Sequence, residues 1–132
     1  CEESLAPASA GAARVVAVHQ PLYPIAGRIG ISLDADPRGR DDLLASMLAW
    51  RVDPVVCGHQ HLYARRWIAD GLLQIAAGGG GARSGRAVFG PAPHTANQEH
   101  FVVLVPGRGT LGVEARSPDG ELLDRFSMEL RR

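Results

Sequence analysis

One stretch of helical periodicity between two short apolar runs constrains the fold of this chain more than any other feature. The spacing predicts a helix over residues 40–52, and Asp53-Pro54 ends it because the residue before a proline avoids the α region. Valine-rich runs at 14–18 and 55–57 flank the helix and predict buried strands. A strand, a helix and a second strand in this order favour a right-handed unit with two parallel strands.

The rest of the chain predicts antiparallel β structure. Asp70-Gly71 is a two-residue hairpin signal between two strand patterns. The expected strands are residues 62–69, 72–77, 101–105, 110–116 and 122–130. Loops are expected over 78–86 and 91–98, and Gly78 to Gly81 lack the following Lys of a phosphate-binding loop, which favours a tight structural crossing. The expected class is therefore α/β, with parallel strands joined by one main helix and then antiparallel hairpins.

Composition excludes several functions. The 132 residues amount to one domain or a piece of one, and the formal net charge is zero. The 14 basic residues are scattered arginines, so no surface for nucleic acid is indicated, and no apolar run reaches membrane-spanning length. Residues 1–13 are acidic without a hydrophobic core, and we expect a frayed lead-in to a single domain over 1–132. The compartment stays open.

Three histidines follow the two predicted parallel strands. His19 comes directly after the first strand, and His59 and His61 come just after the second. Because the carboxyl ends of parallel strands meet at one edge of a sheet, we expect these rings to gather there. Imidazole is a common metal ligand, and two histidines one residue apart can serve two ions about 3.5–4 Å apart. A surface role without metal remains the competing interpretation.

Two longer patterns carry a family resemblance. The first, V-H-x-P-x-Y, covers residues 18–23, and the second, G-H-x-H-x-Y-x-R, covers residues 58–65. Together they resemble the calcineurin-like metallophosphoesterases, and in particular their purple-acid-phosphatase-like branch. The resemblance runs from Arg14 onward and covers the C-terminal half of the family's domain. It implies half of a four-layer αββα sandwich, and it is compatible with a secreted or periplasmic protein.

The resemblance also implies a site. The family hydrolyses phosphate esters at a binuclear centre of divalent or trivalent ions, which here would be Fe, Zn or Mn. By motif, His19 and His59 resemble ligands of the second metal, and His61 resembles a ligand of the first. Tyr63 and Arg65 would contact the phosphate-ester substrate, although their alternation along a strand fits hairpin packing equally well.

The carboxylate ligands of that family are missing. No D-x-H, G-D-x-x-D or G-N-H-[DE] motif is present, and imidazoles alone do not balance the charge of two such ions. We interpret Asp41 and Asp42 as helix-start residues, Asp53 as a turn residue, and Asp34 and Asp36 as solvated loop charges.

We therefore expect the remaining ligands in a missing N-terminal half, and an isolated chain that is inactive. A non-catalytic metal-binding or interaction module is the alternative. A plain β-rich module whose histidines bind nothing is the third reading.

Overall fold

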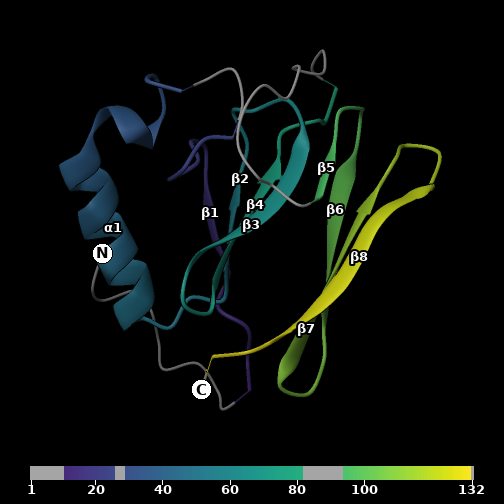
Figure 1. Ribbon diagram of the computed structural model, residues 1–132. Helices are drawn as coiled ribbons and strands as arrows, with labels where there is room; N and C mark the ends of the chain where they lie inside the picture. Colours follow the sequence, from purple (N-terminus) through teal and green to yellow (C-terminus); the bar gives the residue numbers. More distant parts are fainter. Residues whose placement is uncertain (1–10, 26–28, 82–93, 132) are drawn as a thin grey trace.

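The computed structural model describes residues 11–25, 29–81 and 94–131, and in this part the chain forms three layers (Figure 1). Helix α1 (Pro37–Ala49) lies on one face of a five-stranded sheet, and a three-stranded sheet packs on the other face. Most of the predicted lead-in 1–13 and much of the two predicted loops lie outside the described residues.

The five-stranded sheet, sheet A, contains both of the predicted local units. Its strands are β1 (Val16–Val18), β2 (Pro54–Cys57), β3 (Tyr63–Ala69), β4 (Leu72–Ala77) and β5 (His94–Ala96), in the order β1-β2-β4-β3-β5. Strands β1 and β2 are parallel, with Val18 opposite Cys57, and β3 and β4 form the predicted hairpin. These two expectations are confirmed. Strand β5 was expected to be loop, and it pairs with β3 over three residues.

Helix α1 begins and ends three residues earlier than predicted. Asp36 is its N-cap and accepts a hydrogen bond from the Gly39 amide, while Pro37 takes the first helical position, where its missing N–H costs nothing. Arg51 has a φ of 53°, and this left-handed residue ends the helix before the Asp53-Pro54 signal is reached. Asp36 is therefore a cap, and the interpretation of Asp41 and Asp42 as first-turn residues is wrong.

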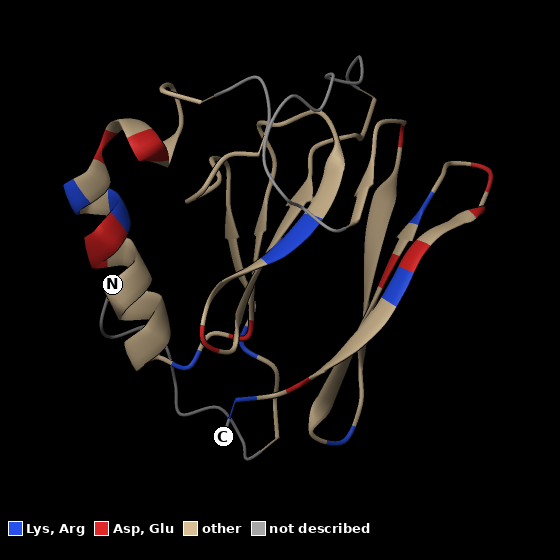
Figure 2. Ribbon diagram, in the orientation of Figure 1, with Lys and Arg blue, Asp and Glu red and all other residues tan. Residues whose placement is uncertain are grey.

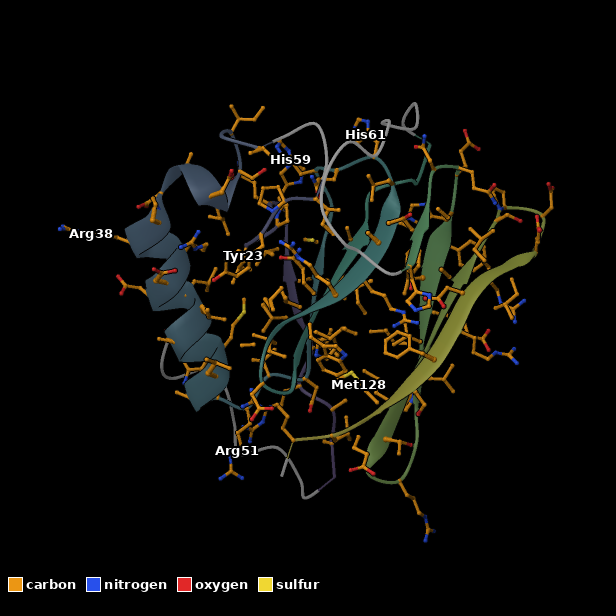
Figure 3. The ribbon with its side chains drawn as sticks, in the orientation of Figure 1. Tyr23, Arg38, Arg51, His59, His61 and Met128 are labelled. Carbon is orange, nitrogen blue, oxygen red and sulfur yellow. The ribbon has the colours of Figure 1, made fainter. Side chains whose placement is uncertain are left out.

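The three-stranded sheet, sheet B, is antiparallel and consists of β6 (Phe101–Pro106), β7 (Thr110–Arg116) and β8 (Leu122–Glu129). One core fills the space between the sheets, and a second lies between sheet A and α1. Met128 of β8 points into the space between the sheets (Figure 3). The alternation of buried and exposed residues along β7 is the pattern expected of a strand with one buried face.

The predicted class is wrong for this chain. Of the described residues, 42% lie in strands and 15% in helices, so the protein is mainly β. A four-layer αββα sandwich, or its half as an α/β unit, is not formed, because α1 is the one α-helix among residues 11–25, 29–81 and 94–131. The local periodicities predicted the elements correctly, whereas the second helical layer came from the family resemblance and has no counterpart in the sequence pattern.

A buried carboxylate closes the end of sheet A where β2 begins. Asp53 is 1% exposed, and its two oxygens accept the backbone N–H groups of Arg14 at 2.9 Å and Arg131 at 2.6 Å. The predicted turn residue is thus a clamp between the segments that lead into β1 and out of β8. In the described part of the chain, no helix has the length and apolarity to cross a membrane.

Candidate metal site

His19 and His59 extend two neighbouring parallel strands. The Gly58 N–H donates to the His19 carbonyl at 3.1 Å, so the β1–β2 ladder continues one step beyond the strands themselves. This hydrogen bond holds the two histidine-bearing segments together at the carboxyl edge of sheet A, the edge where α/β folds collect ligands. The expected meeting of these two strand ends is therefore formed.

The loop after β2 is folded tightly. His59 has a φ of 62°, a left-handed conformation that is uncommon for residues other than glycine and clusters at functional sites. The backbone N–H of Gln60 donates to the backbone carbonyl of Gly58 at 2.6 Å, and the backbone N–H of Leu62 donates to the backbone carbonyl of Gln60 at 2.8 Å. Two successive narrow turns thus reverse the chain between β2 and β3.

The rings of His19 and His59 meet edge to face. His59 Nδ1 lies 3.2 Å from His19 Nε2, and the ring centroids are 5.0 Å apart at an interplanar angle of 72°. Two imidazole nitrogens bound to one tetrahedral zinc ion at 2.0–2.1 Å would be about 3.3 Å apart. The pair therefore has the spacing of two neighbouring ligands of a single ion, and the same spacing suits a hydrogen bond between the rings when no ion is bound.

His61 lies on the same edge as His59, two residues further along the loop (Figure 3). Within the described residues no group of three or more His, Cys, Asp or Glu side chains is arranged to hold an ion, so His61 does not complete a cluster with the other two. Figure 2 shows acidic residues on α1 and sheet B, whereas the loop over 58–62 carries none. The described part of the site consists of imidazoles.

Three of the carboxylates considered in the sequence analysis have other partners. Asp34 was interpreted as a solvated loop charge, but its side chain accepts the amides of Gly30 at 2.6 Å and Ser32 at 3.1 Å. Asp36 caps α1, and Asp53 lies at the opposite edge of sheet A. None of these three replaces the missing acidic ligands.

Two glycines after β4 make close contacts, Gly78 with the loop over 58–62 (the histidine loop) and Gly79 with the His100 ring. A Cβ on Gly78 would lie 2.1 Å from the Gln60 carbonyl oxygen, and one on Gly79 would lie 2.2 Å from the His100 ring. The backbone can approach this closely because glycine has no side chain. The interpretation of this segment as a tight structural crossing is confirmed at these two positions.

Two buried glutamines that the sequence analysis did not single out hold the segment after His19. The side-chain oxygen of Gln74, on β4, accepts a hydrogen bond from the backbone N–H of Tyr23 at 3.0 Å. The side-chain nitrogen of Gln74 donates to the Tyr23 carbonyl at 2.8 Å. Gln60 accepts the Ile25 amide at 3.0 Å. Tyr23 thereby lies between α1 and sheet A (Figure 3). A glutamine inside an apolar strand such as β4 is a signal of buried hydrogen bonding that could have identified Gln74.

We predict that Gln74→Leu lowers the free energy of unfolding by about 1–3 kcal/mol, because it leaves the backbone N–H of Tyr23 without its acceptor. The Tyr23 carbonyl loses one of its two donors and keeps the hydrogen bond from Arg66 at 2.6 Å. Urea denaturation followed by circular dichroism measures this loss. Gln98→Leu is the matched control, since the side chain of Gln98 is exposed, and it should change stability by less than about 0.5 kcal/mol. Equal losses of stability in the two variants would contradict the role of Gln74 in holding the Tyr23 backbone.

Tyr63 and Arg65, which the resemblance placed on the substrate, face sheet B. The Tyr63 hydroxyl donates to Asp124 at 2.6 Å, and Arg65 donates to the same carboxylate at 2.6 and 3.2 Å. The Arg65 guanidinium also lies 4.0 Å from the centroid of the Phe126 ring. Their role in substrate binding stays a prediction, while the structure engages both in a contact between the sheets.

Burial and charge shift three pKa values around these strands. Burial acts to raise the pKa of the Asp124 carboxyl, but hydrogen bonds from Arg65 and Tyr63 outweigh it and leave this pKa below its ordinary value. Burial, followed by the Asp124 contact, raises the pKa of Tyr63. Burial also raises the pKa of the Cys57 thiol to about 12, so this sulfur stays protonated near neutral pH and donates to the Ile75 carbonyl.

Comparisons with known proteins identify the fold and leave the family open. No protein-family model matches the chain, and no curated protein is significantly similar in sequence. A solved structure described as GAP50, the anchor in the inner membrane complex of Plasmodium, matches with a TM-score of 0.72 and 18% sequence identity. The match covers 86% of this chain and 35% of that chain, so the present chain spans about a third of its length. At this identity the likeness shows a shared fold alone, and it gives no support for phosphate-ester hydrolysis.

Proposed function

We propose that this chain contributes the histidine ligands of a metal centre that hydrolyses phosphate esters. The supporting observation is the approach of His59 Nδ1 to within 3.2 Å of His19 Nε2 at the carboxyl ends of two parallel strands. The pair would hold one ion, and His61 would hold a second. The resemblance to metallophosphoesterases assigns the same division of ligands.

The rest of the ligand set belongs, in this proposal, to polypeptide that precedes Cys1. The described residues offer imidazoles, and iron, zinc or manganese ions paired in one site also need charge-balancing oxygen ligands. Such a centre supplies an activated water and positive charge for the phosphoryl oxygens. This chain's part would be to fix two imidazoles at ligand spacing and to present the third beside them.

Metal binding by the isolated chain tests the ligand assignment. We expect zinc to bind weakly, to shift the ring nitrogen signals of His19 and His59 in ¹⁵N NMR spectra, and to lose this effect in His19→Ala and His59→Ala. His94→Ala is the matched control, because His94 lies on β5 against Asp124 and should leave zinc binding unchanged. If zinc still binds to both His19→Ala and His59→Ala, the ligand assignment is contradicted.

Activity of the complete gene product tests the reaction. We expect turnover of a phosphate monoester or diester, for example a nitrophenyl phosphate, and a fall of at least about a hundredfold in His59→Ala and His61→Ala with the fold retained. Retention of full activity in these variants would overturn the proposal. So would a complete gene product without further acidic ligands.

Two observations favour a second candidate, a non-catalytic metal-binding or interaction module. The loop over 58–62 carries imidazoles without carboxylates, and one solved structure that matches this fold is described as an anchor. This candidate predicts that the complete gene product binds metal or a protein partner without hydrolysing either class of phosphate ester. Restored hydrolysis with the preceding polypeptide would exclude it.

A further inference from the structure

A further histidine, which is not among the candidate ligands, lies beside Tyr63 of sheet A. His100 precedes β6 and is 3% exposed. Its ring meets the ring of Tyr63 edge to face, with centroids 5.8 Å apart at 72°, and its Nδ1 lies 2.8 Å from the Gln98 carbonyl oxygen.

The hydrogen bond to Gln98 determines the tautomer of His100. A carbonyl oxygen can only accept, so Nδ1 carries the proton. Nε2 is buried and has no hydrogen-bond partner among the described residues. His100 is thus held in one orientation by a hydrogen bond on one side and by ring packing on the other.

The glycine pair after β4 links this ring to the histidine loop. A Cβ on Gly79 would lie 2.2 and 2.3 Å from Nδ1 and Cε1 of His100, so the ring lies directly against the Gly79 backbone. Its neighbour Gly78 lies as closely against the Gln60 carbonyl, between the two candidate ligands of the loop. Close-packed contacts of this kind transmit displacements, because they leave no free volume to absorb them.

We propose that His100 is a positioning residue for the His19–His59 pair. Its ring presses on Gly79, which keeps Gly78 against Gln60 and thereby fixes the turn that brings His59 Nδ1 to His19 Nε2. This inference rests on the proposed function, because that function is what gives the His19–His59 pair its importance. The positioning of the two rings can be tested in the protein without metal.

Two variants separate the ring from the hydrogen bond. His100→Asn keeps a donor near the position of Nδ1 but removes the ring from Gly79, and His100→Ala removes both. In each folded variant we expect loss of the nuclear Overhauser contacts between the His19 and His59 rings. We also expect a zinc dissociation constant raised by about tenfold or more, the scale on which supporting residues act on metal affinity.

A size exchange adds a test of direct contact. Gly79→Ala should disturb the pair on its own, and the double variant Gly79→Ala/His100→Ala should recover it in part, because the new methyl group occupies the space that the ring vacates. A purely structural role would lower the thermal midpoint of the single variants without moving the ring contacts or the zinc affinity.

Failure of this inference and failure of the proposed function give different results. Folded His100 variants with wild-type ring contacts would overturn the positioning role, whereas absence of zinc binding in the wild-type chain would overturn the metal site alone. Should no variant fold, the wild-type chain decides: NMR must show His100 with its proton on Nδ1 and ring contacts to Gly79, and another tautomer or absent contacts would overturn the inference.

Discussion

Gly78→Ala is expected to disrupt both the candidate site and the fold around it. The added methyl group would lie 2.1 Å from the Gln60 carbonyl oxygen, a distance that no side-chain rotation relieves because the obstacle is backbone. The loop over 58–62 must move, which separates His59 from His19. We predict a loss of about 2–3 kcal/mol in the free energy of unfolding, within the range for overpacked interiors. Chemical denaturation and the ring contacts between His19 and His59 measure the two effects.

Gly80→Ala provides the control for this substitution. A Cβ on Gly80 has no heavy atom within 4 Å, so the same chemical change two residues away should be tolerated. If the two alanine variants have equal stability and equal histidine ring contacts, the close approach of Gly78 to Gln60 does not fix the loop.

Asp124→Ala is expected to have the largest effect on stability. The side chains of Asp124 and Arg65 are 10% and 13% exposed, and the carboxylate receives hydrogen bonds from Arg65 and Tyr63 across the two sheets. Removing one member of such a pair leaves a largely buried cation without a counterion, which costs about 3–5 kcal/mol. Asp119→Ala, in the exposed turn between β7 and β8, should change stability little. Denaturation curves of the two variants make the comparison.

The same cluster predicts how stability depends on acid. The pKa of Asp124 is lower in the folded protein than in the unfolded chain, so the unfolded chain takes up the proton first as the pH falls. Its contribution is complete above the ordinary carboxyl pKa of about 3.9 and is lost as the pH drops through the lower folded value. The wild-type protein should therefore lose more stability than Asp124→Asn on acidification through this range. If the free energies of unfolding of the wild-type protein and of Asp124→Asn fall in parallel as the pH is lowered, Asp124 does not make this contribution.

Local pattern predicted the elements that the chain forms from neighbouring residues. The spacing of apolar residues located α1, the valine runs located β1 and β2, and Asp70-Gly71 located the β3–β4 hairpin. The approach of His19 and His59 followed from one topological rule about parallel strands. Helix bounds were displaced because Asp36 and the left-handed Arg51 set the ends more strongly than the proline signal did.

Contacts between distant residues could not be read in the same way. Asp124 meets Tyr63 and Arg65 across about half the chain, and no local pattern marks which buried polar residue pairs with which. The predicted number of layers was wrong for a different reason. The packing of sheet B on sheet A agrees with the two inner layers of an αββα sandwich, but the second helical layer came from the family resemblance, and the described residues contain no second α-helix to form it.

The Asp53 clamp has a practical consequence for handling this protein. Because one carboxylate binds the backbone at both Arg14 and Arg131, these two residues lie at one pole of the domain, and His59 and His61 lie at the other. A dye or a surface tether attached beside Arg14 or Arg131 therefore lies at the pole opposite His59, so protein immobilised at either position should present its imidazoles to the solution.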